Sequence, residues 1–331
     1  MNLMQKFLKV LLAVVLLSFT GYLKAQTMEE AGTEFNKAIE LVNNDVEAAL
    51  SSFEKSIEMF EKVIANPASE EESFTAEDLK MKAEQQLPNL YFKSATSLYK
   101  DKKYDEAIKR FEETVAVCEK YSDESIKEKA NGNIATLFSM KGSSAYKSKE
   151  YDMAIELFDK ALEKSPDDTR ALFGKGLVLR KQKKTDEMIV VLEKTIEVGE
   201  EDDKSVINAK KLLAGHYSVE GAKKIKSKAY SEALSLQEKA LSFDETYANA
   251  YYYSAVIYNL QNEWDQAIEA ANKGLENENG DDMKKAKFYM ELGNAYKGKG
   301  NKDEACKAYT NASFDDFTEQ AKQMKTELKC D

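Results

Sequence analysis

The chain has 331 residues, of which 43% are hydrophobic and 32% charged, a balance typical of folded proteins rather than disordered ones. Its 59 acidic and 48 basic residues give a net charge of −11, which argues against nucleic acid and anionic membrane surfaces as partners. Only 3 prolines and 14 glycines occur, so we expect an all-α protein of long helices with charged, solvated faces.

Segment 1–25 has the pattern of a secretory signal peptide. Lys6 and Lys9 precede an apolar run from Val10 to Phe19, and Ala25 stands where a signal peptidase would cut. The run is shorter than the about 20 residues that a membrane-spanning helix needs, so cleavage after Ala25 is favoured over an uncleaved anchor. No cysteine stands directly after the run, which argues against a lipid anchor. Cleavage removes three lysines and no acid, so the net charge would change from −11 to −14.

Residues 26–87 predict N-terminal helices that contain a degenerate repeat. VEAALSSFEKSIEMFEKV, from Val46, is typical of the second helix of a hairpin, and MEEAGTEFNKAIELV would be its partner. NPASEEESFT, at 66–75, is the strongest predicted loop of the chain. A new helix is expected to start at Thr75 and to meet Pro88, which either kinks it or marks a fresh start.

From residue 88 onward, two short phrases alternate along the chain. The first places a large apolar residue four positions before alanine or glycine, so that both lie on one helix face. The second carries an apolar stripe at i, i+4 and i+7, as in Ala154, Phe158 and Ala161. The first phrases begin at Tyr91, Phe138, Leu172, Tyr217, Tyr251 and Tyr289, and the second phrases begin at Tyr104, Tyr151, Thr185, Tyr230, Trp264 and Lys302.

Each pair of phrases predicts a hairpin of two helices that pack closely at the small residues. Pro166 ends one such unit because it cannot continue a helix. Equivalent positions in consecutive hairpins, such as Ala154 and Met188, are separated by the same number of residues in some pairs of hairpins. In other pairs this separation is longer. The excess predicts first helices that are extended at their N-terminal ends, with caps at Asp123 or Ser125 and at Asp202 or Asp203.

The period and the order of aromatic and small residues resemble the tetratricopeptide repeat family over about 91–317, most strongly at Phe138–Pro166 and Tyr289–Ala312. The resemblance implies a right-handed α-solenoid of stacked antiparallel hairpins, with six repeats in 88–318 and six to seven in all. Departures from the pattern predict looser packing locally, and they include Met188, Thr195, Gln237 and Ala271. Residues 319–331 are interpreted first as a polar capping helix and second as a partner-binding tail.

The chain has three cysteines, Cys118, Cys306 and Cys330, which export would place in an oxidising compartment. Cys306 and Cys330 could staple the last helix to its neighbour. Unpaired, buried cysteines are the favoured alternative, because two positions in a sequence do not establish the reach of a disulfide.

Binding in repeat arrays of this kind falls on the concave surface formed by the first helices. Positions beside the packing stripe of each first helix are the candidates to line this groove. They are Phe92, Thr96, Tyr99, Ser139, Ser143, Tyr146, Phe173, Leu177, Tyr252, Val256, Asn259, Met290 and Asn294. Some members of the family read a C-terminal carboxylate with lysine, asparagine and arginine on this face, but Phe92, Thr96 and Phe173 stand at such places here. A peptide or helix with apolar side chains is the better ligand hypothesis.

The sequence offers little for catalysis. His216 is the only histidine, no glycine-rich phosphate loop occurs, and the acidic pairs at 167–168 and 281–282 are expected to be loop caps. We therefore predict no enzyme, no cofactor and no metal. The main hypothesis is a non-catalytic protein-binding scaffold or adaptor in the periplasm or at the outer-membrane periphery of a Gram-negative bacterium. The alternative is a glycan or nutrient capture protein at the outer membrane. Five tyrosines crowd 247–258 and invite a stacking interpretation, in which Tyr252 or Tyr253 is the better binding candidate, while Tyr251 and Tyr258 are expected to pack inside the hairpin.

Overall fold

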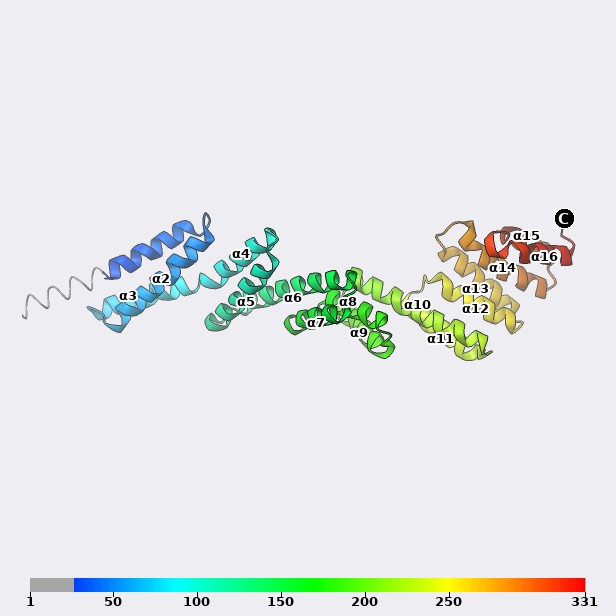
Figure 1. Ribbon diagram of the computed structural model, residues 1–331, viewed down its shortest axis with the longest axis horizontal. Coiled ribbons are helices and arrows are strands. Elements are labelled where there is room, and N and C mark those ends of the chain that lie inside the picture. The colour runs from blue at the N-terminus through cyan, green and yellow to red at the C-terminus, as the bar shows by residue number, and fades with distance from the viewer. Residues whose placement is uncertain (1–26, 331) are drawn as a thin grey trace, which may run out of the picture. The chain divides into compact units, whose positions relative to one another are not determined.

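The computed structural model describes residues 27–330, and those residues form helices joined by turns, with no strand (Figure 1). The chain divides into two compact units, one ending at Ala171 and the other beginning at Leu172. We call them unit 1 and unit 2. The all-α architecture of stacked helix hairpins is confirmed. No described helix has the length and apolar character needed to cross a membrane. The predicted signal peptide lies outside the described residues.

Unit 1 begins with a helical segment at 27–41. The helices that follow are α2 (Val46–Ala65), α3 (Glu70–Glu84), α4 (Leu87–Lys100), α5 (Tyr104–Tyr121), α6 (Glu124–Lys147) and α7 (Tyr151–Lys164). Segment 27–41 and α2 share a hydrophobic core in which Phe35 packs edge-on against Phe53 and Phe60. Two helices thus pack together before the main array, where the sequence predicts a degenerate repeat.

Unit 2 holds the remaining hairpins, beginning with α8 (Thr169–Lys181), which starts three residues before the boundary. The others are α9 (Thr185–Val198), α10 (Lys204–Lys226), α11 (Tyr230–Phe243), α12 (Ala248–Leu260), α13 (Trp264–Asn277), α14 (Asp282–Gly298), α15 (Lys302–Asn311), the short 3-10 helix η1 (Asp315–Phe317) and α16 (Thr318–Leu328). All six second helices, α5, α7, α9, α11, α13 and α15, begin at the residue where the second phrase begins.

The turn inside each of the six hairpins has the same backbone form. One residue per turn adopts a left-handed conformation, with φ between 60° and 80°. These residues are Lys102, Lys149, Lys183, Lys228, Asn262 and Gly300. Glycine adopts this conformation freely and asparagine does so more readily than other residues, so the four lysines show that the close return of the chain matters more than the local preference of the residue.

The long intervals of the repeat are indeed taken up by extended first helices. α6 has 24 residues and begins after Asp123, whose carboxylate accepts a hydrogen bond from the amide of Ile126. α10 has 23 residues and begins after Asp203, which accepts from the amide of Ser205. The caps predicted at these two aspartates are confirmed.

The start of α3 differs from the sequence prediction. The helix begins at Glu70 rather than at Thr75, because Ser69 accepts a hydrogen bond from the amide of Glu72 while the Glu72 carboxylate accepts one from the amide of Ala68. Three glutamates in the first turn also stabilise the positive end of the helix dipole. Pro88 stands in the first turn of α4, so it marks a fresh start and not a kink.

The core is built from small residues on first helices that receive large residues from second helices. A Cβ atom added to Gly142 would lie 2.9 Å from the Phe158 ring, and one added to Gly293 would lie 2.4 Å from Tyr309. Phe158 and Tyr309 are buried, and so are the neighbouring alanines Ala154 and Ala305. This is the small and large packing that the phrases predict.

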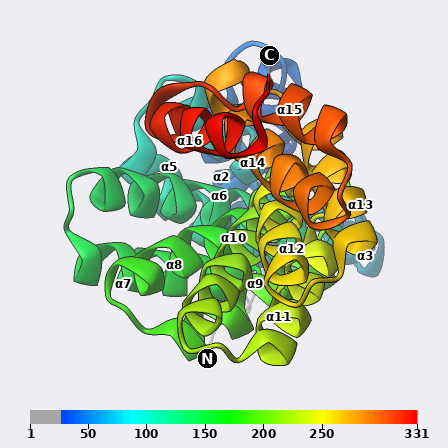
Figure 2. The same ribbon diagram turned by 90° about the vertical axis from the view of Figure 1, so that its right-hand side faces the viewer.

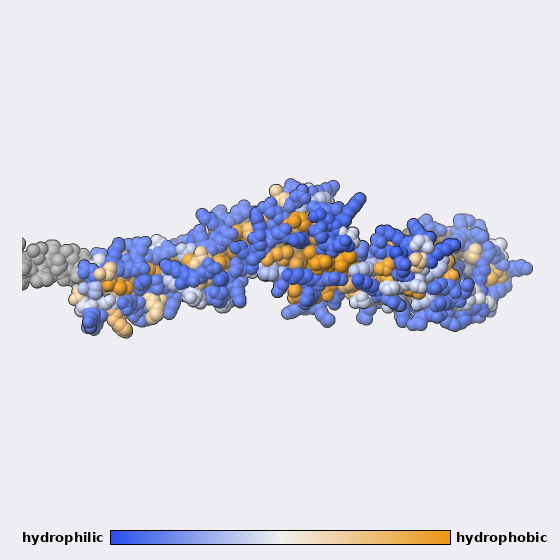
Figure 3. All heavy atoms as spheres, turned by 90° about the horizontal axis from the view of Figure 1, so that it is seen from below, coloured by the Kyte–Doolittle hydropathy of each residue, from blue (hydrophilic) through white to orange (hydrophobic). Residues whose placement is uncertain are grey.

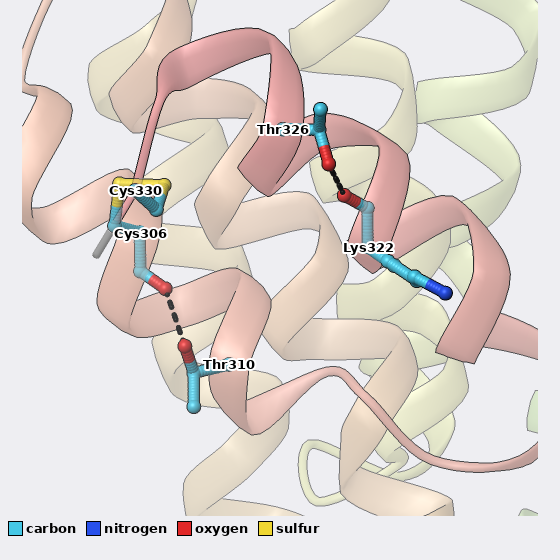
Figure 4. The surroundings of a disulfide bond; sticks show 5 residues. All are labelled: Cys306, Thr310, Lys322, Thr326 and Cys330. Atoms are coloured by element: carbon cyan, nitrogen blue, oxygen red, sulfur yellow. Dashed lines mark hydrogen bonds between the residues drawn. A yellow bond between two sulfur atoms is a disulfide. The ribbon is translucent and has the colours of Figure 1, made fainter.

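The C-terminal end of unit 2 is closed by α16, which lies beside α15 (Figure 2). Ala321, Met324 and Leu328 of α16 pack into the core that contains Tyr309. A disulfide joins Cys306 of α15 to Cys330, with 5.6 Å between the two Cα atoms (Figure 4). The favoured prediction of unpaired cysteines is therefore wrong for this pair, whereas Cys118 is unpaired and buried as predicted.

Candidate functional site

The predicted groove residues of unit 1 mostly pack around the hairpin turns. Tyr99 lies 6.0 Å, between ring centroids, from Tyr104 at the start of α5, and Tyr146 lies 6.0 Å from Tyr151 at the start of α7. Each tyrosine pair bridges the two helices of its hairpin. These side chains are half-buried and fill space, so little of their surface is left for a ligand.

The remaining candidates of unit 1 divide by exposure. Phe92 packs edge-on against Phe111 at 5.5 Å, and the Thr96 hydroxyl donates to the Phe92 carbonyl. Ser143 is exposed. Ser139 is only 3% exposed, so it cannot line a groove, and the prediction for this residue is wrong. The position was chosen as one beside the packing stripe, but the packing of the helices covers it.

The tyrosine pair at the turn occurs only in the first two of the six hairpins, and the third hairpin is the first without it. Arg180 and Thr185 stand one repeat after Tyr146 and Tyr151, at the equivalent positions of α8 and α9. Threonine is much shorter than tyrosine, and an open pocket of about 470 Å³ lies here, with both Arg180 and Thr185 in its wall. The departure from the repeat pattern thus coincides with a cavity.

The pocket combines an apolar floor with a polar rim. Met188 of α9 and Leu212, Gly215 and Val219 of α10 supply the apolar part. The polar wall is formed by Arg180, Thr185, Lys211, His216 and Tyr247. The volume falls within the range of about 300–1,000 Å³ that is usual for ligand pockets.

The rim of the pocket is electropositive on a chain of net negative charge. Arg180 and Lys211 are exposed, and neither forms an ion pair within residues 27–330. The Tyr247 hydroxyl lies 3.2 Å from where a Cβ of Gly215 would be, so only glycine leaves it this close to the α10 backbone. Two cations and a hydroxyl beside apolar side chains suit a ligand that carries a negative group next to an apolar one.

His216 adds a neutral polar group to the wall. Its ring packs edge-on against Tyr217, with 5.2 Å between the centroids. Burial lowers the pKa of His216 below its usual value, and the nearby Lys223 and Lys239 act in the same direction against Glu220. The imidazole is therefore uncharged near neutral pH and can donate or accept a hydrogen bond.

Two predicted groove residues of α8 share a helix face with Arg180. Phe173, Leu177 and Arg180 stand at i, i+4 and i+7, and Phe173 and Leu177 are half-buried. The predicted groove residues of α8 thus lie on the same helix face as one residue of the pocket wall. Arg180 itself was not among the predicted residues.

The predicted groove residues of α12 and α14 meet at a buried carboxylate. Asn259 of α12 donates through Nδ2 to Glu291 Oε2 at 2.7 Å, and Asn294 of α14 lies 3.4 Å from the same oxygen. Glu291 is only 8% exposed, and burial raises its pKa above the usual value. The Tyr309 hydroxyl donates to Asn294, so the network reaches α15. The Asn259 Oδ1 atom is buried without a hydrogen-bond partner in the described structure.

Tyr252 and Met290 also differ from the groove prediction. The Tyr252 ring packs edge-on against Phe288 at 5.9 Å, beneath the Lys287 amine, and burial raises its pKa to about 12. Met290 is 1% exposed and belongs to the core, so its assignment to a groove is wrong. Val256 is half-buried on the same helix as Tyr252. Because Tyr252 faces a neighbouring helix, it offers no open stacking platform.

Several residues of these two sites were not selected from the sequence. Glu291 carries no signal in the sequence, because only the docking of α12 on α14 buries it. The sequence does mark the position of the pocket. Thr185 replaces an aromatic residue, and Met188 replaces an alanine, that recur at these positions of the second phrase. Among the described residues, no group of three or more histidine, cysteine or acidic side chains is placed to bind a metal ion.

Comparison with known families identifies the repeat directly. Two segments match tetratricopeptide repeat models. They are residues 139–187, which run from α6 to the start of α9, and residues 286–312, which include most of α14 and all of α15. The resemblance drawn from the phrases is confirmed over these segments. The first match ends beside Met188, so it includes Arg180 and Thr185 of the pocket wall. A comparison with curated proteins finds no match.

The solved structures that are similar to this chain include those of two named proteins. A structure described as MamA protein is 23% identical and covers 58% of this chain and 94% of its own, with a TM-score of 0.36. A form of MamA from Desulfovibrio magneticus RS-1 is 17% identical, with coverages of 58% and 96% and a TM-score of 0.35. YrrB, described as a TPR protein with an unusual peptide-binding site, is 20% identical, with coverages of 60% and 91% and a TM-score of 0.34. Scores this low carry no argument about function.

Proposed function

We propose that this chain is a non-catalytic protein-binding scaffold or adaptor of the bacterial cell envelope. In this proposal the pocket of unit 2 formed by α8, α9 and α10 holds a peptide or helical segment of the partner. The observation that carries the proposal is the pocket itself, which lies where Arg180 and Thr185 stand in place of the tyrosine pair of the first two hairpins. An apolar side chain of the partner enters the pocket, and a neighbouring carboxylate contacts Arg180 and Lys211.

The location in the envelope is supported by two features of the chain. The N-terminal segment has the lysines, apolar run and small residues of a signal peptide. The Cys306–Cys330 disulfide suits an oxidising compartment such as the periplasm. N-terminal sequencing of the protein from the periplasmic fraction tests this part, and the expected first residue is Gln26. A chain that retains Met1 in the cytoplasmic fraction would contradict it.

The binding site is tested by filling the pocket. Thr185→Tyr restores the aromatic residue of the repeat and should occupy the cavity without disturbing the fold, whereas Thr185→Ser leaves the cavity open. A photo-crosslinking residue at Val219, which is 51% exposed on the pocket wall, would report the partner in the native envelope.

A cross-linked protein should be seen with the parent and with Thr185→Ser, and it should be lost with Thr185→Tyr. An unchanged cross-link in the tyrosine variant would show that the partner does not use the pocket. Enrichment of glycan without any protein partner would replace the scaffold by the glycan capture function.

A further inference from the structure

Helix α3 of unit 1 exposes large apolar side chains on the side that faces away from its core. Ala76 and Ala83 are fully buried in the core shared with α2. Phe74 and Met81 are 73% and 50% exposed. These two residues are seven positions apart, so they lie on one side of the helix about 10.5 Å from each other. Hydrophobic side chains interrupt the otherwise hydrophilic surface in this part of the chain (Figure 3).

The apolar side of α3 continues into a pocket of about 390 Å³. Met81 forms one wall, and Pro88 at the start of α4 and Tyr121 at the end of α5 form the rest of the apolar lining. We call Phe74, Met81, Pro88 and Tyr121 the α3 surface. Its apolar groups come from three helices of the same unit, so it is more than one exposed side chain.

Carboxylates outnumber cations around the α3 surface, where the Lys120 amine lies over the Tyr121 ring. The pocket also has Glu84, Asp123 and Glu124 in its wall. The sequence of α3 holds six acidic residues and two lysines, and the lysines are already engaged, Lys82 with Asp78 and Lys80 with two glutamates. Glu71 and Glu77, beside Phe74, form no ion pair within residues 27–330.

We propose that the α3 surface is a second docking site, and that its occupant is a basic amphipathic helix of a partner protein. Two apolar residues of that helix, one on each of two turns, would contact Phe74 and enter the pocket beside Met81. Lysine or arginine residues that flank them would pair with Glu71 and Glu77. Such a surface is distinct from the pocket of unit 2, whose exposed rim is basic.

Charge complementarity favours this occupant over the other candidates. A second copy of the chain would bring one acidic α3 against another, and the net charge of −11 adds to that repulsion. An anionic membrane is repelled for the same reason. A basic helix gains attraction from the carboxylates while it covers the exposed phenylalanine and methionine.

The test uses the full chain and a pair of synthetic peptides that are long enough to be helical in isolation. One alanine-rich peptide carries two leucines seven positions apart, flanked by lysines, and the other has glutamates in place of the lysines. Binding is measured by fluorescence anisotropy at low and high salt, with the parent and with Phe74→Ser. Met153→Ser on α7 is the matched control, because Met153 is 53% exposed in the same unit.

The basic peptide should bind the parent and the Met153→Ser chain equally, and Phe74→Ser should weaken binding by roughly 30-fold, the loss expected for a central apolar anchor. Binding should also weaken at high salt. The proposal is overturned if the acidic peptide binds as well as the basic one, if Phe74→Ser has no effect, or if the basic peptide does not bind. A dimer of the parent that dissociates with Phe74→Ser, or binding to phosphatidylglycerol vesicles through Phe74, would also overturn it.

Discussion

Glu291 is a carboxylate that the packing of α12 against α14 removes from water. Its hydrogen bonds from Asn259 and Asn294 offset part of the cost of burial, yet its pKa stays above the usual value because desolvation outweighs them. The folded chain therefore binds this proton more readily than the unfolded chain. The stability that this residue contributes is fully present below the ordinary glutamate pKa of about 4.3 and is lost as the pH rises through the higher pKa of the folded state.

Glu291→Gln should therefore stabilise the protein at neutral pH, by about 1 kcal/mol, because the new amide can donate to the unpartnered Asn259 Oδ1 atom. The gain should shrink toward about pH 4, where Glu291 is protonated in both states. Urea unfolding at several pH values measures this difference. Glu276→Gln on α13 is the control, since Glu276 is exposed. A gain that does not depend on pH would contradict the assignment.

The sequence predicted the surroundings of single residues less well than any other feature of the structure. Ser139 and Met290 were chosen for a groove by their place along a helix, but their burial depends on which neighbouring helix covers them. Asn259 and Asn294 were selected for the same groove by their place along the helices. The Glu291 carboxylate joins these two asparagines. Sequence patterns could not predict this contact, because it depends on the packing of two hairpins and no pattern within one helix encodes it.

At the scale of helices and hairpins the sequence predicted much more. The second helices begin where their phrases begin, because the small and large residues that define each phrase are also those that hold the two helices together. Asp123 and Asp203 were found as caps because the longer intervals showed where an extended helix had to begin. The start of α3 was missed because the acidic run was interpreted as a loop, whereas Ser69 caps the helix and the Glu72 carboxylate accepts from the amide of Ala68.

Gly142→Leu tests the packing inside one hairpin. The added side chain meets the Phe158 ring, which is buried and cannot move aside, so the two helices must separate. We expect a loss of about 1–3 kcal/mol of unfolding free energy, which thermal unfolding would show as a lower midpoint. Gly132→Ala in the same helix is the control, because nothing lies within 4 Å of its added Cβ. That change should stabilise α6 slightly through helix propensity. Equal melting curves for Gly142→Leu and the parent would refute the packing.

At the scale of the whole molecule, each unit has its own cores, and the last repeat of unit 2 needs a cover for its outer face. α16 provides that cover with few buried residues, since Ala321 is the only fully buried one in the helix. Lys297 of α14 binds Glu327 of α16 at 2.8 Å, an exposed pair that contributes little. The Cys306–Cys330 disulfide adds a covalent restraint on this end.

Reduction of the disulfide should release α16. The bond closes a segment with a sequence separation of 24 residues, for which a contribution of about 3 kcal/mol is expected. Hydrogen exchange of the α16 amides should accelerate in dithiothreitol, while the amides of unit 1 should keep their protection. Cys306→Ser should show fast exchange with or without the reductant. If α16 exchanges at the same rate in all four samples, its packing alone is sufficient to hold it.

The repeated left-handed turn has a consequence for how such a chain can change over evolution. Six turns share one backbone form, so an inserted or deleted residue there would alter the registry of both helices in the hairpin. The loops that connect one hairpin to the next do not share this backbone form. α6 and α10 each carry additional helical turns at their N-terminal ends, next to such a loop, and the two helices of each of these hairpins still pack together. New surface can therefore be added in whole helical turns at one set of sites, and the array tolerates growth without redesign of its core.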